Sequence, residues 1–182
     1  MSKFVLMNID MNLDPQSIQE AIKRVNFLKE KLATGLQELA RMLTEDRGPR
    51  IAQMYIAQFP AVDTGALHDS MSGEYDSGTH TGHVKANVPY AVYVEFGTGI
   101  VGEDNPHPQK EELGIEYPAA QKYGESGWWY PSEDGWYTPK DSTVKLAWTM
   151  GMPARPFMYN TLRELELEAE REGGQIIAKY IP

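Results

Sequence analysis

Residues 90–102 read YAVYVEFGTGIVG, an apolar run that leads directly into three closely spaced glycines. The glycines spell G-x-G-x-x-G, the pattern of a turn that binds a dinucleotide. Such a turn requires a buried strand before it and a helix opening within it, because the amides of the helix N-terminus receive the pyrophosphate. The apolar run suits a strand, but residues 103–108 (EDNPHP) carry two prolines and two early carboxylates that argue against the helix. We therefore expect no nucleotide cofactor.

The composition bounds the class of protein. The chain has 182 residues, of which 41% are hydrophobic, and this suits one domain with a substantial core. Its net charge of −9 argues against a dedicated nucleic-acid-binding surface, which depends on clustered Lys and Arg. The absence of cysteine excludes disulfides and thiolate metal sites. The first residues, MSKFVLMNID, are too short an apolar run for a signal peptide or a membrane span, so we expect a soluble, intracellular protein without membrane contact.

A short strand is predicted over Phe4–Ile9, and a long amphipathic helix follows it. Asp14 suits the N-cap of this helix and Pro15 its first position. Gly48-Pro49 should break or kink the helix, after which a second helical piece continues to Gln58. Apolar residues recur at spacings of three and four, which predicts one apolar stripe: Ile18, Ile22, Val25, Leu28, Leu32, Leu36, Leu39 and Leu43.

A β-hairpin is predicted next, with strands over residues 66–75 and 82–88 and a turn at residues 76–79. Val84, Ala86 and Val88 alternate with polar residues, so they should form the core face of the second strand. Pro89 should end that strand and start a short helix through Phe96.

Residues 99–153 have no regular period, so we interpret them as an insertion. They hold all four tryptophans amid Gly, Pro and acidic residues. Three interpretations are open: a loop that packs its own aromatic cluster, an interface for another protein, or a platform for sugar rings. The candidate interface residues are Trp128, Trp129, Trp136 and Trp148.

The last helix is predicted to open at residues 155–157 (RPF), with Pro156 near its first position. Phe157 begins its apolar face and should be buried against the sheet and the N-terminal helix. Gly173-Gly174 should interrupt the helix before an apolar tail at residues 176–181. The same face continues through Thr161, Leu165 and Ala169, with Met158 and Leu162 beside it.

Catalytic and metal-binding patterns are weak. The zinc-protease motif H-E-x-x-H and the hydrolase motif G-x-S-x-G do not occur, and carboxylate pairs arise by chance among 26 acidic residues. The four histidines (His68, His80, His83 and His107) fit solvent-exposed turns better than a metal site. We therefore expect no enzyme activity, no cofactor and no metal.

Three segments taken in order carry a family resemblance: VDTGALHDS at residues 62–70, YAVYVEFGTG at 90–99 and ARPFM at 154–158. Together they resemble the tail-completion, or neck, family of long-tailed bacteriophages, over roughly residues 14–172. Residues 99–153 are longer than the matching loop of a minimal family member. The positions that match the family motifs are Asp63, Thr64, Gly65, Leu67, Ser70, Tyr90, Ala91, Glu95, Phe96, Gly97, Thr98, Arg155, Pro156 and Phe157.

The resemblance implies a structural protein of the virion. Such proteins form part of a ring that joins the DNA-filled head to the tail, with other neck and tail proteins as partners and DNA only as passing cargo. It also implies assembly in the host cytoplasm and a final place at the virion neck. The acidity would let DNA slide past, or it would simply keep the protein soluble. The alternatives are a carbohydrate- or cell-wall-binding module that uses the tryptophans, and a phage-encoded hydrolase.

Together the patterns predict an α+β fold, with a long N-terminal helix and a C-terminal helix packed on a small antiparallel sheet. We expect a single domain over residues 1–182, with the insertion at 99–153. Phe96-Gly97-Thr98 should form a sharp turn that glycine permits. For Glu95, a lone charge after an apolar run, three environments are open: it accepts backbone amides, pairs with Arg155, or faces water.

Overall fold

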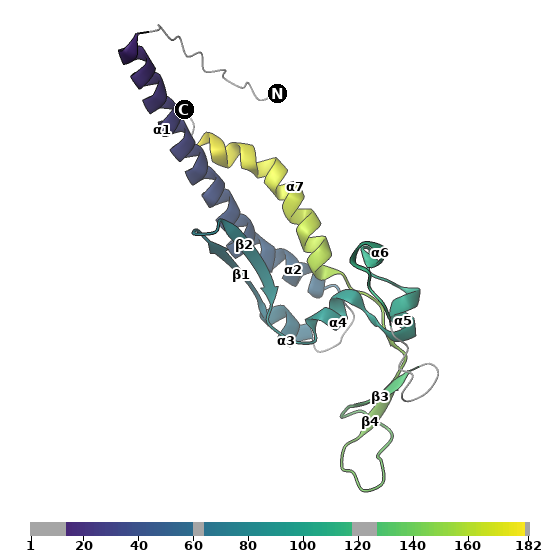
Figure 1. The fold of residues 1–182 in the computed structure, drawn as a ribbon. Helices are drawn as coiled ribbons and strands as arrows, with labels where there is room; N and C mark the ends of the chain where they lie inside the picture. Colours follow the sequence, from purple (N-terminus) through teal and green to yellow (C-terminus); the bar gives the residue numbers. More distant parts are fainter. Residues whose placement is uncertain (1–13, 60–63, 118–126, 181–182) are drawn as a thin grey trace.

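The computed structural model describes residues 14–59, 64–117 and 127–180. The strand expected over Phe4–Ile9, the motif residue Asp63 and the end of the apolar tail lie outside these ranges. Figure 1 shows an elongated molecule in which two long helices converge at one end and a two-stranded arm projects at the other. The helices and the small antiparallel sheets confirm the predicted α+β class.

The N-terminal helix α1 (Pro15–Arg41) begins where the sequence predicts. The Asp14 carboxylate accepts the amides of Gln16 and Ser17, each at 3.0 Å, and these bonds lower the pKa of Asp14. The helix then passes through a π-helical turn, η1 (Met42–Arg47), into α2 (Gly48–Ile56). The interruption predicted at Gly48-Pro49 is thus a local change of winding rather than a break in the helix.

The predicted hairpin is formed by β1 (Met71–Asp76) and β2 (Thr81–Ala86), which pair antiparallel. The strand predicted from Ala66 was wrong at its beginning, because α3 (Thr64–Asp69) occupies that stretch. This short helix directs Leu67 into the core. The period-two pattern used to predict the strand does not detect so short a helix. The hairpin packs closely on η1, since a Cβ on Gly73 would lie 1.7 Å from the carbonyl oxygen of Thr44.

The core gathers residues from widely separated parts of the chain. Phe157, the first residue of α7 (Phe157–Ala178), has no exposed surface, as predicted. Val84 and Ala86 of β2 and Val88, just beyond its end, pack against the cluster, which confirms the predicted core face although the strand ends at Ala86. The buried members of the cluster are Ala52, Ile56, Leu67, Met71, Ala91, Val94 and Phe157.

Helix α7 crosses α1, and glycines lie at the crossing. A Cβ on Gly35 of α1 would lie 3.2 Å from the Tyr180 ring, and one on Gly173 would lie 3.2 Å from Leu39. The predicted interruption at Gly173-Gly174 was wrong, because α7 continues to Ala178. Packing against α1 offsets the roughly 1 kcal/mol that a glycine costs within a helix.

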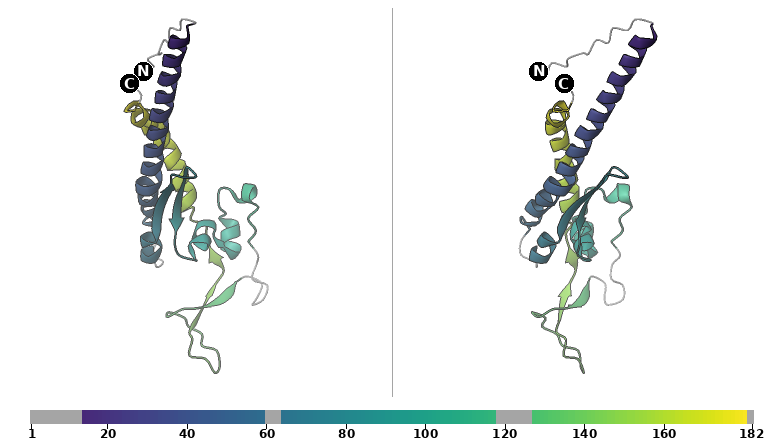
Figure 2. Two further views of the ribbon diagram at one scale, coloured as in Figure 1. Left: turned by 60° about the vertical axis from the view of Figure 1, so that its left-hand side comes forward. Right: turned by 90° about the vertical axis from the view of Figure 1, so that its left-hand side faces the viewer.

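Residues 99–153 contain more secondary structure than their composition suggests. The expectation that no helix opens after Gly97 was wrong, since α5 (Gly99–Asp104) fits entirely before Pro106. The short helix predicted after Pro89 and through Phe96 is confirmed as α4 (Ala91–Phe96), so no strand precedes the glycines and the strand–turn–helix order of a dinucleotide site is missing. Two strands form the arm that projects in Figure 2. The remaining elements are α6 (Lys110–Leu113), β3 (Trp128–Pro131), β4 (Leu146–Thr149) and β5 (Gly151–Met152).

Candidate functional site

The second and third sequence motifs meet at Glu95, whose side chain is buried at the end of α4. Its carboxylate accepts the backbone amides of Met158 at 2.8 Å and of Tyr159 at 2.9 Å. These amides belong to the first turn of α7, where the N-cap residue supplies no side-chain hydrogen bond. Glu95 therefore satisfies donors that every helix start leaves open, and its charge lies at the positive end of the helix dipole. Of the three environments predicted for Glu95, acceptance of backbone amides is confirmed.

His107 is the second polar group buried at this point, with 3% of its surface exposed. Its Nδ1 accepts the amide of Gln109 at 3.1 Å, so the ring proton resides on Nε2, which donates to Glu95 at 3.1 Å. The ring lies between Phe96 and Tyr159, with centroids 4.8 and 5.5 Å away. The prediction of a solvent-exposed histidine was therefore wrong for His107.

The other three histidines are less enclosed. His80 and His83 are exposed on the hairpin, as predicted. His68 differs from its prediction because it lies in α3 rather than in a turn, with its ring half exposed and hydrogen-bonded to Asp69 at 2.8 Å.

Further hydrogen bonds fix residues 105–117 against the buried pair Glu95 and His107, which we call the Glu95 node. The amide of His107 donates to the Tyr117 hydroxyl at 3.1 Å, and that hydroxyl donates to the Phe96 carbonyl at 2.7 Å. Ala154, just before the third motif, donates its amide to the carbonyl of Asn105 at 3.1 Å. The node thus ties α4, residues 105–117 and the start of α7 into one unit.

The other motif residues support the same junction. Gly97 has a φ of +77°, and a Cβ there would lie 2.6 Å from the amide nitrogen of Ala154, so the predicted sharp turn is confirmed. The amide of Arg155 donates to the Val94 carbonyl at 2.9 Å, while its guanidinium lies over the Phe59 ring. The predicted pairing of Arg155 with Glu95 is therefore replaced by a cation–π contact.

The remaining motif residues lie at helix starts, in the core, or in a backbone bridge. Thr64 and Gly65 begin α3, and Tyr90 and Pro156 precede α4 and α7. Leu67, Ala91 and Phe157 are core residues, and Ser70 donates its hydroxyl to the Leu67 carbonyl at 2.8 Å. Thr98 forms a backbone bridge with Met152. The three motifs therefore converge on one structural junction, although they are far apart in sequence.

The tryptophans of the arm form a cluster of their own. The Trp129 ring lies 4.7 Å from Trp136, 5.0 Å from Tyr137 and 5.3 Å from Trp148, measured between centroids. Trp136 nevertheless remains 74% exposed. Trp128 lies at the base of the arm, beside Gly99. Their role as an interface stays a prediction.

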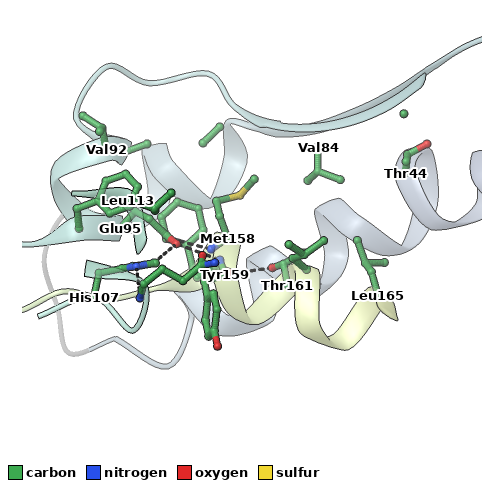
Figure 3. Close-up of a pocket in the computed structure, with 17 residues that line it drawn as sticks. Thr44, Val84, Val92, Glu95, His107, Leu113, Met158, Tyr159, Thr161 and Leu165 are labelled. Carbon is green, nitrogen blue, oxygen red and sulfur yellow. Dashed lines mark hydrogen bonds and ion pairs between the residues drawn. The ribbon is translucent and has the colours of Figure 1, made fainter. Parts of the chain in front are cut away.

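A feature that sequence reasoning missed is an apolar groove bounded by β2, α4, α6 and α7, with a volume of about 560 Å³. Figure 3 shows Val84, Leu165 and Thr161 along it, with Glu95 and His107 toward one end. Val92, Leu113 and Leu162 stand at its rim with about half of their surface exposed. The groove is formed by segments about 80 residues apart, so no local sequence pattern predicts it.

The described residues hold no group of three or more His, Asp or Glu side chains that would suit a metal ion. Within the same residues, no helix is both long and apolar enough to cross a membrane.

Comparison with known proteins places part of the chain in a phage context. Residues 23–97 match the model of a family described as "Bacteriophage HK97-gp10, putative tail-component". The matched span runs from within α1 to Gly97, so it includes the hairpin, the first sequence motif and the second motif as far as Gly97. No curated protein and no solved structure matches the chain. The family match confirms the resemblance to phage tail proteins and supports a structural role in a phage tail.

Proposed function

Because residues 23–97 match a phage tail-component family, we propose that this chain is a structural protein of the head–tail junction. It forms part of a ring that joins the DNA-filled head to the tail, assembles in the host cytoplasm and ends at the virion neck. Its partners are other neck and tail proteins, and it performs no catalysis. It acts as a single domain, with residues 99–153 as an insertion.

The observation that carries the proposal is an apolar surface on α1 that the described residues leave exposed, and part of it lies inside the matched span. Five residues of the stripe keep at least 39% of their surface exposed. Soluble monomers rarely expose a contiguous apolar surface of this kind, and such patches mark contacts with other proteins. The exposed members are Ile18, Ile22, Val25, Leu32 and Leu36.

The shape also supports an adaptor. The α1 stripe and the aromatic arm lie at opposite ends of the elongated molecule (Figure 1), so the chain offers separate surfaces to two neighbours. A stable interface buries at least about 1,200 Å² in total, and an adaptor needs one toward each side.

The charge is compatible with DNA as passing cargo. A net charge of −9 around a ring lumen would repel the phosphate backbone and let DNA slide without binding. The same charge also serves solubility, so it supports the proposal without carrying it.

The test is electron microscopy of a lysate from a phage that lacks this gene. We expect DNA-filled heads and separate tails of normal length, with few joined virions, because the protein acts after packaging and apart from tail polymerisation. Purified protein added to the lysate should restore joining. Empty heads alone would move the protein to packaging, and missing tails would move it to tail initiation.

A second candidate function is binding of carbohydrate or cell wall through the arm. The 74% exposure of Trp136, whose ring meets the Trp129 ring edge to face, favours it because exposed aromatic rings can stack on sugar faces. Glycan-array binding that disappears on Trp136→Ala or Trp129→Ala would support this function. Mutant particles that assemble normally but fail to adsorb would also favour it over the neck role.

A further inference from the structure

The exposed stripe lies on a side of α1 that α7 does not reach. At 100° per residue, its exposed members Ile18, Ile22, Val25, Leu32 and Leu36 lie roughly 60–140° around the helix from Gly35. Gly35 faces α7, where Ile177 and Tyr180 lie within 3.3 Å of an added Cβ. The described residues therefore leave the stripe open to another occupant, and its spacing of three and four gives a continuous apolar seam for a helix to present.

The groove is the complementary apolar surface on the same chain. Its floor is made by Val84 and Ala86 of β2 and by Met158 and Leu165 of α7. The exposed rim residue Leu162 offers further apolar contact. Grooves of this kind accept amphipathic helices, which place apolar side chains into them at every third or fourth residue.

Charge also distinguishes the two surfaces. Helix α1 carries five basic and three acidic residues, although the whole chain has a net charge of −9. Two segments that border the groove are acidic by count: α7 carries two basic and five acidic residues, and residues 99–113 carry one basic and four acidic residues. None of these carboxylates lines the groove itself. Attraction thus favours α1 against the groove, whereas two α1 helices would repel each other.

Lys29 sharpens this preference. It is exposed and falls within the stripe, between Val25 and Leu32. In a pair of α1 helices it would place a charge in the apolar seam, which costs stability. Against the groove it lies near two segments of net negative charge instead.

We propose that α1 of one copy lies in the groove of the next copy, with the stripe against β2, α4 and α7. The interface is heterologous, because two different surfaces of the chain meet, and repetition of such a contact closes into a ring when the rotation fits. This inference rests on the proposed ring at the head–tail junction and names the contact that builds it.

Cysteine cross-linking of the full chain tests the contact, since the natural sequence contains no cysteine. Val25→Cys and Leu32→Cys each place a thiol in the stripe. Two positions are used so that the result does not depend on one assumed position of α1 along the groove. Leu162→Cys marks the groove, and Met54→Cys on α2 is a matched control with similar exposure outside it. A short bis-maleimide should link a stripe variant to the Leu162→Cys protein in a mixture. It should link neither to the Met54→Cys protein above background.

A variant with one stripe cysteine and Leu162→Cys should give a ladder of dimers, trimers and larger species, because each copy carries both halves of the contact. Adding Lys29→Glu should lower the linked fraction several-fold, and circular dichroism should show an unchanged fold. Links only between two stripe cysteines would replace the proposal with pairing of α1 helices. Linking no greater than in the Met54→Cys control would overturn it in favour of a different protein as the occupant.

The result can be separated from that of the lysate experiment. A ladder together with normally joined virions in the mutant lysate would refute the neck function and leave the contact standing. Separate heads and tails without stripe-to-groove links would refute the contact alone.

Discussion

Phe157 and Trp129 each stand at the centre of an apolar cluster, but the clusters are built differently. Phe157 is fully buried by side chains from α2, α3, α4 and β1, which come from segments up to about 100 residues away. Trp129 contacts Trp136, Tyr137 and Trp148, all within the same arm, and Trp136 remains mostly exposed.

The difference separates residues that hold the fold from residues available to a partner. A cluster assembled across the chain gives up its contacts only when the whole domain unfolds. A cluster assembled within one hairpin can be altered with little effect on the rest. We therefore expect mutations in the Phe157 cluster to change stability, and mutations in the arm to change binding.

The largest effect should come from Phe157→Ala. Removal of a fully buried ring leaves a cavity and should lower the free energy of unfolding by about 3–5 kcal/mol. Urea denaturation followed by circular dichroism measures this change. Leu162→Ala, one turn later on α7 and half exposed, is the matched control and should cost much less. Equal stability of the two variants would remove the distinction between the clusters.

Glu95→Ala should have the next largest effect. It leaves the amides of Met158 and Tyr159 and the Nε2 proton of His107 without their acceptor. Each buried group left unsatisfied costs about 1–3 kcal/mol, so we expect a loss of at least about 2 kcal/mol in unfolding free energy.

Two variants control the Glu95 experiment. Glu95→Gln keeps one acceptor oxygen and should lose less than Glu95→Ala. Glu116→Ala changes an exposed carboxylate and should stay within about 0.5 kcal/mol of the wild type. If Glu95→Ala resembled Glu116→Ala, the cap on α7 would contribute nothing to stability.

The features that the sequence predicts correctly are those with local causes. Asp14 caps the amides two and three residues ahead, and Phe157 follows a proline that suits a helix start. Both signals lie within a few residues. The α+β class follows from the same kind of information, because each element carries its own period.

The features that the sequence does not predict depend on residues far away in the chain. Glu95 binds amides 63 and 64 positions away, and His107 is buried by rings of Phe96 and Tyr159. Gly173 was expected to end a helix, since its packing against Leu39 is invisible in the local sequence. The α1 stripe shows a further limit, because periodicity predicts an apolar face but not whether this chain or another covers it.

The smallest effect on stability should come from shortening the arm. Trp129 and Trp148 are paired across β3 and β4, so residues 130–147 can be replaced by Asn-Gly, a sequence that suits a two-residue hairpin turn. The Phe157 cluster and the Glu95 node lie outside the deleted residues. The free energy of unfolding should therefore stay within about 0.5 kcal/mol of the wild type, a shift of roughly 1–2 °C in Tm. A shortened protein that melts far lower, or without cooperativity, would show that the arm belongs to the core.

If the shortened protein folds normally, its addition to a lysate without the wild-type protein tests the role of the arm. Failure to join heads to tails would assign an assembly contact to the arm. Full joining would leave that contact to α1 and the groove.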